Sequence, residues 1–187
     1  MITINEVSKG MALRVDGDIW TIVDFLHVKP AKGSAFVKIK MRNLKTGNVI
    51  ERTYRTAETL EDVPVEERRM PYSYNADGLY YFMCQETYEE VTVSEDMVKD
   101  IVPYLLDNLG VTGYVHEDKV LKVTLPNFIV AKVVEAPPGV KGDSSKTDTK
   151  PAKIETGASV MIPLFVDVGE SIKIDTRTGL YVERVKQ

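Results

Sequence analysis

Short stretches of alternating apolar and polar residues run through the first third of the chain. The clearest is residues 36–42, where apolar positions alternate with basic ones (Val37, Ile39, Met41; Lys38, Lys40, Arg42). This alternation predicts a β-strand with one buried and one exposed face. A second strand-like run, residues 19–28, precedes it across a short loop that contains Pro and Gly. The two runs therefore predict a β-hairpin whose tip carries Lys32 between two small residues, Ala31 and Gly33.

The same rhythm of strands and turns continues to residue 63. Asp16-Gly17 and residues 44–48 are typical turn segments, and strand-like runs rich in β-branched residues flank them. Five or so short strands at this spacing predict a small closed barrel over residues 1–63. Pro64 marks the expected end of this first module.

Residues 64–127 predict a second module, which contains the strongest helix signal of the chain. Ser94 is a good N-cap, apolar residues recur at helical spacing from 97 to 109, and Pro103 is expected to kink or split the helix. Strand-like runs lie on both sides of it (residues 73–75, 80–83, 88–93, 113–115 and 120–125). Three strands, a helix and two strands are the element order of an OB-fold.

Residues 128–187 return to a pure strand pattern and predict a third module, again a small barrel. Its strand-like runs are separated by turns and by one long polar loop, residues 137–153 (strands at 128–135, 159–166, 171–175 and 180–185). Plain disorder is the alternative for the loop, because it is rich in Gly, Ser, Thr and Lys. The whole pattern predicts an all-β protein of three small β-barrel modules in tandem.

Charge separates these modules more sharply than composition does. The chain has a net charge of −4, yet residues 27–55 carry eight basic residues and one acid, whereas residues 64–127 carry five basic residues and twelve acids. A positive region in an acidic protein indicates a polyanionic partner at the hairpin. The plainer reading is a solvated hairpin with ordinary surface lysines.

No catalytic, metal or membrane signal accompanies these modules. His27 and His116 lie far apart and have no Cys partners nearby, which argues against a metal site. Cys84 is the one cysteine, so no internal disulfide is expected, and we predict a buried, inert thiol. No membrane span or signal peptide is recognisable. These observations favour a non-enzymatic, cytoplasmic protein.

The third module offers a second set of residues that suit RNA. Arg177 and Arg184 can bind phosphate through planar guanidinium groups, and Tyr181 can stack on a base or ribose. The structural alternative makes Arg177 a turn residue and Tyr181 a half-buried strand residue. From the residues alone, the structural alternative is favoured.

Several of these stretches together resemble the bacterial elongation factor P family. The resemblance is collinear over essentially the whole chain, and the last of its runs is the most specific (residues 28–36, 45–47, 68–70, 72–74, 81–83, 137–144 and 175–185). One position departs from the family pattern, because Ala31 stands where the family usually has Gly. A Cβ at Ala31 disfavours a positive φ and leaves the shape of the loop open.

The resemblance implies both a fold and a function. The fold would be an SH3-like (KOW-like) barrel, residues 1–63, followed by two OB-fold barrels, residues 64–127 and 128–187, in an elongated shape like that of tRNA. The function would be that of a translation factor that binds the 70S ribosome, through both subunits, between the P and E sites. There the family positions the peptidyl-tRNA, stimulates peptide-bond formation and relieves stalling at consecutive prolines.

The resemblance also assigns roles to individual residues. Lys32 would reach towards the acceptor end of the P-site peptidyl-tRNA and would be the target of a lysine-modifying enzyme, with a β-lysyl or similar extension. Residues 142–144 would approach the E-site codon of the mRNA (Gly142, Asp143, Ser144). Further residues would contact tRNA or ribosomal RNA (Lys29, Pro30, Ala31, Gly33, Lys38, Lys40, Arg42, Arg177, Tyr181 and Arg184). The protein would be a monomer without a dissociable cofactor.

Two other classes of protein remain open at this stage. One is a general OB protein for single-stranded RNA, which the net charge of −4 disfavours mildly. The other is a carrier module with a modified lysine at a hairpin tip, similar to biotinyl or lipoyl domains. Those domains usually have Met or Asp beside the lysine, and Ala31 and Gly33 do not fit.

Overall fold

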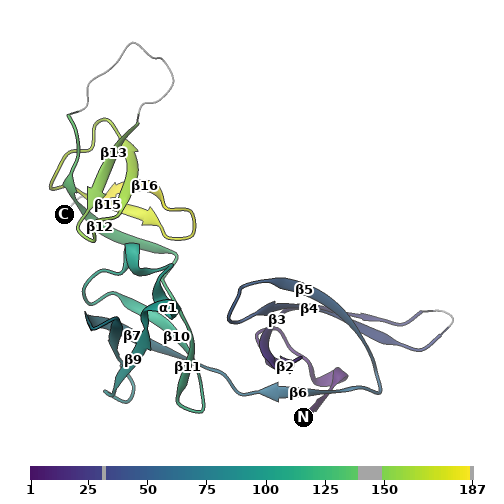
Figure 1. The fold of residues 1–187 in the computed structure, drawn as a ribbon. Coiled ribbons are helices and arrows are strands. Elements are labelled where there is room, and N and C mark those ends of the chain that lie inside the picture. Colours follow the sequence, from purple (N-terminus) through teal and green to yellow (C-terminus); the bar gives the residue numbers. More distant parts are fainter. Residues whose placement is uncertain (31–32, 139–148, 186–187) are drawn as a thin grey trace. The chain divides into compact units, whose positions relative to one another are not determined.

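The computed structural model describes residues 1–30, 33–138 and 149–185 (Figure 1). Within these residues the strands form three sheets of six, five and five strands, and helix is confined to a few short segments. The predicted all-β class is confirmed. The chain divides into two compact units, residues 1–67 with 113–122, and residues 68–112 with 123–187. The division into three modules at residues 63 and 127, and the elongated shape, remain predictions.

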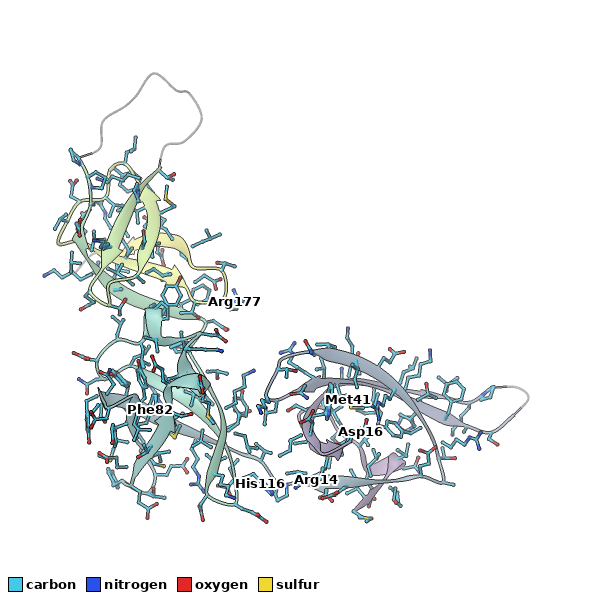
Figure 2. The ribbon with its side chains drawn as sticks, in the orientation of Figure 1. Arg14, Asp16, Met41, Phe82, His116 and Arg177 are labelled. Atoms are coloured by element: carbon cyan, nitrogen blue, oxygen red, sulfur yellow. The ribbon has the colours of Figure 1, made fainter. Side chains whose placement is uncertain are left out.

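The first sheet contains the predicted hairpin. Its strands follow the order β1-β6-β2-β3-β4-β5 (β1 Ile2–Thr3, β2 Ala12–Val15, β3 Asp18–Val28, β4 Phe36–Asn43, β5 Val49–Arg55, β6 Thr59–Val63), and a short 3-10 helix, η1, spans Ile4–Glu6. Val37, Ile39 and Met41 of β4 are fully buried, as their alternation predicts, and Met41 lies inside the curved sheet (Figure 2). The Asp16-Gly17 turn has positive φ at both residues, which suits a tight hairpin.

The second sheet has the predicted order of three strands, a helix and two strands. Its strands are arranged β11-β10-β7-β8-β9, with α1 after β9 (β7 Glu66–Ala76, β8 Leu79–Met83, β9 Glu90–Ser94, α1 Glu95–Val98, η2 Val102–Tyr104, β10 Gly110–His116, β11 Lys119–Thr124). Phe82 of β8 is fully buried in this region (Figure 2). Cys84 is also fully buried, as predicted, and a hydrogen bond with the Thr87 side chain lowers the pKa of its thiol.

The predicted helix is much shorter than its apolar pattern indicates. It is a single turn, Glu95–Val98, and the 3-10 helix Val102–Tyr104 follows after a break. Pro103 splits the segment because it lacks an N–H and cannot continue an α-helix. Leu106 and Leu109 do not extend a helix; they pack against the core of the third sheet. The apolar character of these two positions therefore reflects the packing of a loop on the third sheet.

The third sheet follows the order β14-β13-β12-β15-β16 (β12 Phe128–Glu135, β13 Thr149–Ile154, β14 Ser159–Pro163, β15 Ser171–Asp175, β16 Leu180–Val185). Its core consists of aliphatic residues from all strands except β16 and from the loop after β14 (Ile129, Ala131, Val133, Ala152, Ile154, Val160, Ile162, Val166, Ile172 and Ile174). Tyr181 of β16 packs against this core at the edge.

Strand β13 lies inside the stretch predicted as a polar loop, so that prediction is wrong for residues 149–153. The strand alternates between exposed and buried positions, but Lys150 occupies a buried one, with 5 % of its surface exposed. Its ammonium lies 3.6 Å from the exposed carboxylate of Asp167. Pro151 is tolerated because a neighbouring strand lies on only one side of it. Strand β14 pairs with β13 at Pro151, whereas β12 pairs only with the last two residues of β13. A buried lysine and a proline together conceal the strand pattern.

Side chains of the second and third sheets contact each other directly within the unit that contains residues 68–112 and 123–187. The Thr156 hydroxyl donates to the Pro103 carbonyl at 2.6 Å, and the Thr176 hydroxyl donates to the Pro126 carbonyl at 2.6 Å. Tyr104 packs on the core of the third sheet and lies against Gly179 in the β15–β16 turn. The contacts of Thr176 and Gly179 fix the β15–β16 turn against Pro126 and Tyr104, and that of Thr156 fixes the β13–β14 turn against Pro103.

Candidate nucleic-acid interface

The basic side chains of β4 form the outer face of the first sheet. Strands β3 and β4 run side by side away from the barrel (Figure 1), and β5 pairs with β4 as far as Phe36. Lys38, Lys40 and Arg42 are all exposed, opposite to the buried set on the same strand. The predicted outward orientation of these three cations is confirmed.

Most of these cations are available to a partner. Lys38 forms a long ion pair of 3.7 Å with Glu51. The nearby carboxylate of Asp24 forms an ion pair of 2.7 Å with Lys9 and not with the β4 cations. The hydrogen bond from Lys9 lowers the pKa of Asp24, with a further contribution from the Phe25 N–H. Among the described residues, no ion pair involves Arg42. The face therefore presents positive charge that the protein does not neutralise itself.

The end of the hairpin is only partly described. Lys29 and Pro30 are exposed and follow β3 directly. Gly33 has φ of +110°, a conformation that other residues rarely adopt, so glycine is required there. Ala31 and Lys32 lie outside the described residues, and their predicted roles stay predictions.

In the third sheet, Arg177 is bound to its own chain. It follows β15 and holds Asp175 through two bonds, Nε to Oδ1 at 3.0 Å and Nη2 to Oδ2 at 2.6 Å. These bonds lower the pKa of Asp175 from 3.8 to about 2, and the largest cause is the Arg177 side chain. Arg177 is a turn residue, as the structural alternative expects, and it lies where the third sheet meets the second (Figure 2).

The other two residues of that set lie on β16. Arg184 donates to Glu170 at 2.9 Å, and its guanidinium stands 5.7 Å from the centre of the Phe165 ring. Tyr181 is half-buried against the core. Gly142, Asp143 and Ser144 lie outside the described residues, so their predicted approach to a codon is untested.

Sequence reasoning missed two residues beside Arg177. The exposed ring of Phe128 on β12 has Lys173 Nζ 5.2 Å and Arg177 Cζ 5.7 Å from its centre. The run 128–135 is almost entirely apolar, which obscures its alternation. The sequence signal that could reveal Phe128 is Lys132. The two residues are four positions apart on one strand, so they lie on the same face, and the lysine marks that face as the outward one.

Neither a metal centre nor a membrane helix is present in the described ranges. No three His, Cys, Asp or Glu side chains gather as metal ligands among residues 1–30, 33–138 and 149–185. No helix in this part of the chain is long and apolar enough to cross a membrane.

Comparison with known families covers nearly the whole chain. Residues 3–60 match the elongation factor P KOW-like domain, residues 65–123 match the elongation factor P OB domain, and residues 129–184 match the elongation factor P C-terminal domain. The chain belongs to the elongation factor P family. The KOW-like and OB assignments of the first two regions agree with the fold class predicted from sequence.

Individual relatives support the same family. Elongation factor P of Caldanaerobacter subterraneus subsp. tengcongensis is 46% identical over 185 residues, which cover 99% of this chain and 100% of the relative. Elongation factor P of Gloeobacter violaceus is 47% identical over 185 residues, covering 98% and 99%. These relatives are named as translation factors and not as enzymes, which confirms the expected non-enzymatic class.

Eukaryotic translation initiation factor 5A from Methanococcus jannaschii aligns with a TM-score of 0.49 and 18% identity over 66% of this chain and 93% of that one.

Proposed function

We propose that this protein binds the 70S ribosome between the P and E sites, positions the peptidyl-tRNA and relieves stalling at consecutive prolines. The observation that supports this most is the family match over all three regions, combined with the exposed basic face of β4. Ribosomal RNA and tRNA are polyanions, and Arg42 has no ion pair among the described residues that would compete with them.

The proposed mechanism needs positioning and no acid–base chemistry. Proline is a poor partner in peptide-bond formation because its ring fixes φ and restricts the approach of the reacting groups. Holding the peptidyl-tRNA in a reactive geometry removes part of the entropic barrier, and well-oriented reactants gain rate without a catalytic side chain. The protein would supply this orientation from the hairpin of β3 and β4.

Lys32 is the proposed working residue of the hairpin. In the sequence it stands between Ala31 and Gly33, whose small size would leave the ammonium accessible among phosphates. A β-lysyl or similar extension, added by a separate enzyme, would lengthen its reach towards the acceptor end of the tRNA. Lys29, Lys38, Lys40 and Arg42 would bind RNA behind it.

The remaining parts of the proposal concern the third region and the cellular setting. Residues 142–144 would lie near the E-site codon, while Arg177, Tyr181 and Arg184 would lie near tRNA or small-subunit RNA. Because Arg177 and Arg184 are each bound to a carboxylate, their contribution to RNA binding would be smaller than that of the β4 cations. The protein would act in the cytoplasm as a monomer.

The test is a translation assay in an extract depleted of this protein. It compares a reporter that contains three consecutive prolines with a matched reporter that lacks them. Lys32→Ala should lose most of the rescue, and Lys45→Ala, an exposed lysine of the β4–β5 turn, should retain it. Lys32→Arg keeps the charge but cannot carry a lysine-specific extension, so it fails like Lys32→Ala if the extension is required. Full rescue by Lys32→Ala would contradict the proposal.

A further inference from the structure

Phe128 is an exposed aromatic residue at the start of β12 in the third sheet. Its strand, β12, alternates strictly over its first six residues: Ile129, Ala131 and Val133 are at most 2 % exposed, whereas Phe128 is 44 % exposed. Val130 on the same face is 50 % exposed. An exposed ring of this size beside a second apolar residue is a surface that a partner can cover.

Two cations stand beside this ring. Lys173 Nζ is 5.2 Å and the Arg177 guanidinium carbon 5.7 Å from the ring centre, both within the range of a cation–π interaction. Each cation is held by a carboxylate of the same sheet or turn: Lys173 by Glu183 at 2.9 Å, and Arg177 by Asp175. The carboxylates fix the positions of both cations before any partner arrives.

Both cations keep hydrogen-bond donors free for a partner. A guanidinium group has five N–H donors, and Asp175 accepts from Nε and from one N–H of Nη2, so three donors remain on Arg177. An ammonium has three donors, and Glu183 accepts one of them from Lys173. A phosphate oxygen could therefore bind without breaking either ion pair.

The backbone around Phe128 is fixed on two sides. Thr176 in the β15–β16 turn donates its hydroxyl to the Pro126 carbonyl at 2.6 Å and its N–H to the Asn127 carbonyl at 3.0 Å. The same turn is held by Tyr104 against Gly179. The ring and its two cations thus form a preorganised group, which lowers the entropic cost of binding.

We propose that Phe128, with Lys173 and Arg177, is a stacking platform for one base of single-stranded RNA, and that the two cations bind a neighbouring phosphate. Every base offers a π-face to an aromatic ring, and the phosphate supplies the negative charge that two cations within 6 Å of the ring centre favour. The choice of RNA as the partner rests on the proposed function. Phe128 and Lys173 then act in RNA binding, and Arg177 acts through donors that its ion pair leaves free.

A second exposed aromatic residue serves as a matched control. Phe165, in the loop between β14 and β15, is 62 % exposed and has one cation, Arg184, at 5.7 Å. It has no second cation beside the ring among the described residues. Phe165→Leu therefore removes a comparable ring from the surface without removing the proposed platform.

The experiment measures binding of a fluorescein-labelled oligouridine of about twelve nucleotides, within the site size of OB-folds, to the full chain by anisotropy at low salt. Phe128→Leu should weaken binding by about tenfold, because base stacking on an aromatic ring contributes an effect of this order. Phe128→Tyr should bind like the wild type.

Lys173→Gln should weaken binding and reduce the dependence of log K on log salt by about one. Phe165→Leu should bind like the wild type, and an RNA duplex of equal length should compete poorly.

Failure of this inference differs visibly from failure of the proposed function. Wild-type affinity in Phe128→Leu, equal losses in Phe128→Leu and Phe165→Leu, or no binding of oligouridine at all would overturn the platform, even if Lys32 proves essential for rescue at prolines. If Lys32→Ala retains full rescue while oligouridine binding still depends on the Phe128 ring, the platform is supported and the proposed function fails. Circular dichroism melting confirms that Phe128→Leu, a change at an exposed ring, remains folded.

Discussion

The hairpin of β3 and β4 and the hairpin of β15 and β16 both carry basic residues, but they use them differently. On the first hairpin, Arg42 has no ion pair within the described part of the chain. On the second, Arg177 is bound to Asp175 and Arg184 to Glu170. The first hairpin leaves its charge to a partner, whereas the second uses much of its charge within its own fold.

The β15–β16 turn and the β4–β5 turn, which follows the first hairpin, also differ in their packing. Gly179 in the β15–β16 turn lies so close to Tyr104 that a Cβ would stand 2.6 Å from the Tyr104 hydroxyl. Gly47 in the β4–β5 turn has a similar φ, +77° against +70°, but nothing within 4 Å of a Cβ position. Counting cations near a turn therefore does not identify an RNA contact; their partners and the packing of the turn must be known.

The largest effect expected from this difference concerns the stability of the two turns. Gly179→Ala should lower the free energy of unfolding by about 2–3 kcal/mol, because an L-residue at positive φ costs roughly 1–2 kcal/mol and the clash with Tyr104 adds to it. Gly47→Ala should cost only the backbone part, about 1 kcal/mol. Urea denaturation measures both values.

Removal of the Tyr104 hydroxyl separates packing from backbone strain. In a Tyr104→Phe background, the next atom near the Cβ position is the ring carbon at 3.7 Å, which is an ordinary contact. Gly179→Ala should then cost about as much as Gly47→Ala. An unchanged penalty in that background would mean that the turn is not held by Tyr104.

The next effect concerns RNA binding by unpaired and paired cations. Arg42→Glu should weaken ribosome binding by about tenfold, because it replaces an exposed positive charge that has no ion pair among the described residues with a charge that repels phosphate. Lys153→Glu, at a lysine already bound to Glu135 at 2.8 Å, should weaken binding less. Pelleting of ribosomes with each variant at two salt concentrations gives the comparison.

A further control uses the acidic region. Glu89→Lys and Glu90→Lys change exposed residues of the second region, where residues 64–127 carry twelve acids and five basic residues. They should affect ribosome binding less than Arg42→Glu does. Losses of equal size in all three variants would remove the argument from charge distribution.

The sequence predicts most of the strands because burial follows a period of two that single residues rarely hide. Residues 36–42 show this best, since the buried and exposed sets separate in the structure as they do in the alternation. Strand β13 escapes prediction because Lys150 is buried and Pro151 lies within the strand. The helix is overestimated because Leu106 and Leu109 have helical spacing but pack on another sheet. Local patterns cannot distinguish these two origins of apolar spacing.

The candidate site is predictable only as far as it depends on single strands. The outward cations of β4 follow from alternation, but the bonds of Arg177 with Asp175 and its contact with Phe128 depend on how the β15–β16 turn folds and on a neighbouring strand. Pairing between β12 and β15 places Phe128 opposite Asp175, although the two residues are 47 positions apart in the sequence. No local pattern encodes this neighbourhood.

The smallest effect expected is a pH dependence that arises from the Asp175–Arg177 ion pair at the second hairpin. The pKa of Asp175 is lowered to about 2 in the folded protein, chiefly by Arg177, from an ordinary value of 3.8. A lowered folded-state pKa means that the ion pair stabilises the protein fully above the unfolded-state pKa and that this contribution is lost as pH falls from about 4 to about 2. Arg177→Gln should therefore melt below the wild type at pH 6, and the difference should shrink towards pH 2. Asp175→Asn should abolish the same pH-dependent component, whereas Arg55→Gln, at the end of β5 in the first sheet, should leave the acid profile unchanged. Calorimetric melting between pH 2 and pH 6 measures all three, and a constant difference between Arg177→Gln and the wild type across this range would show that the pair has no part in the acid stability of the hairpin.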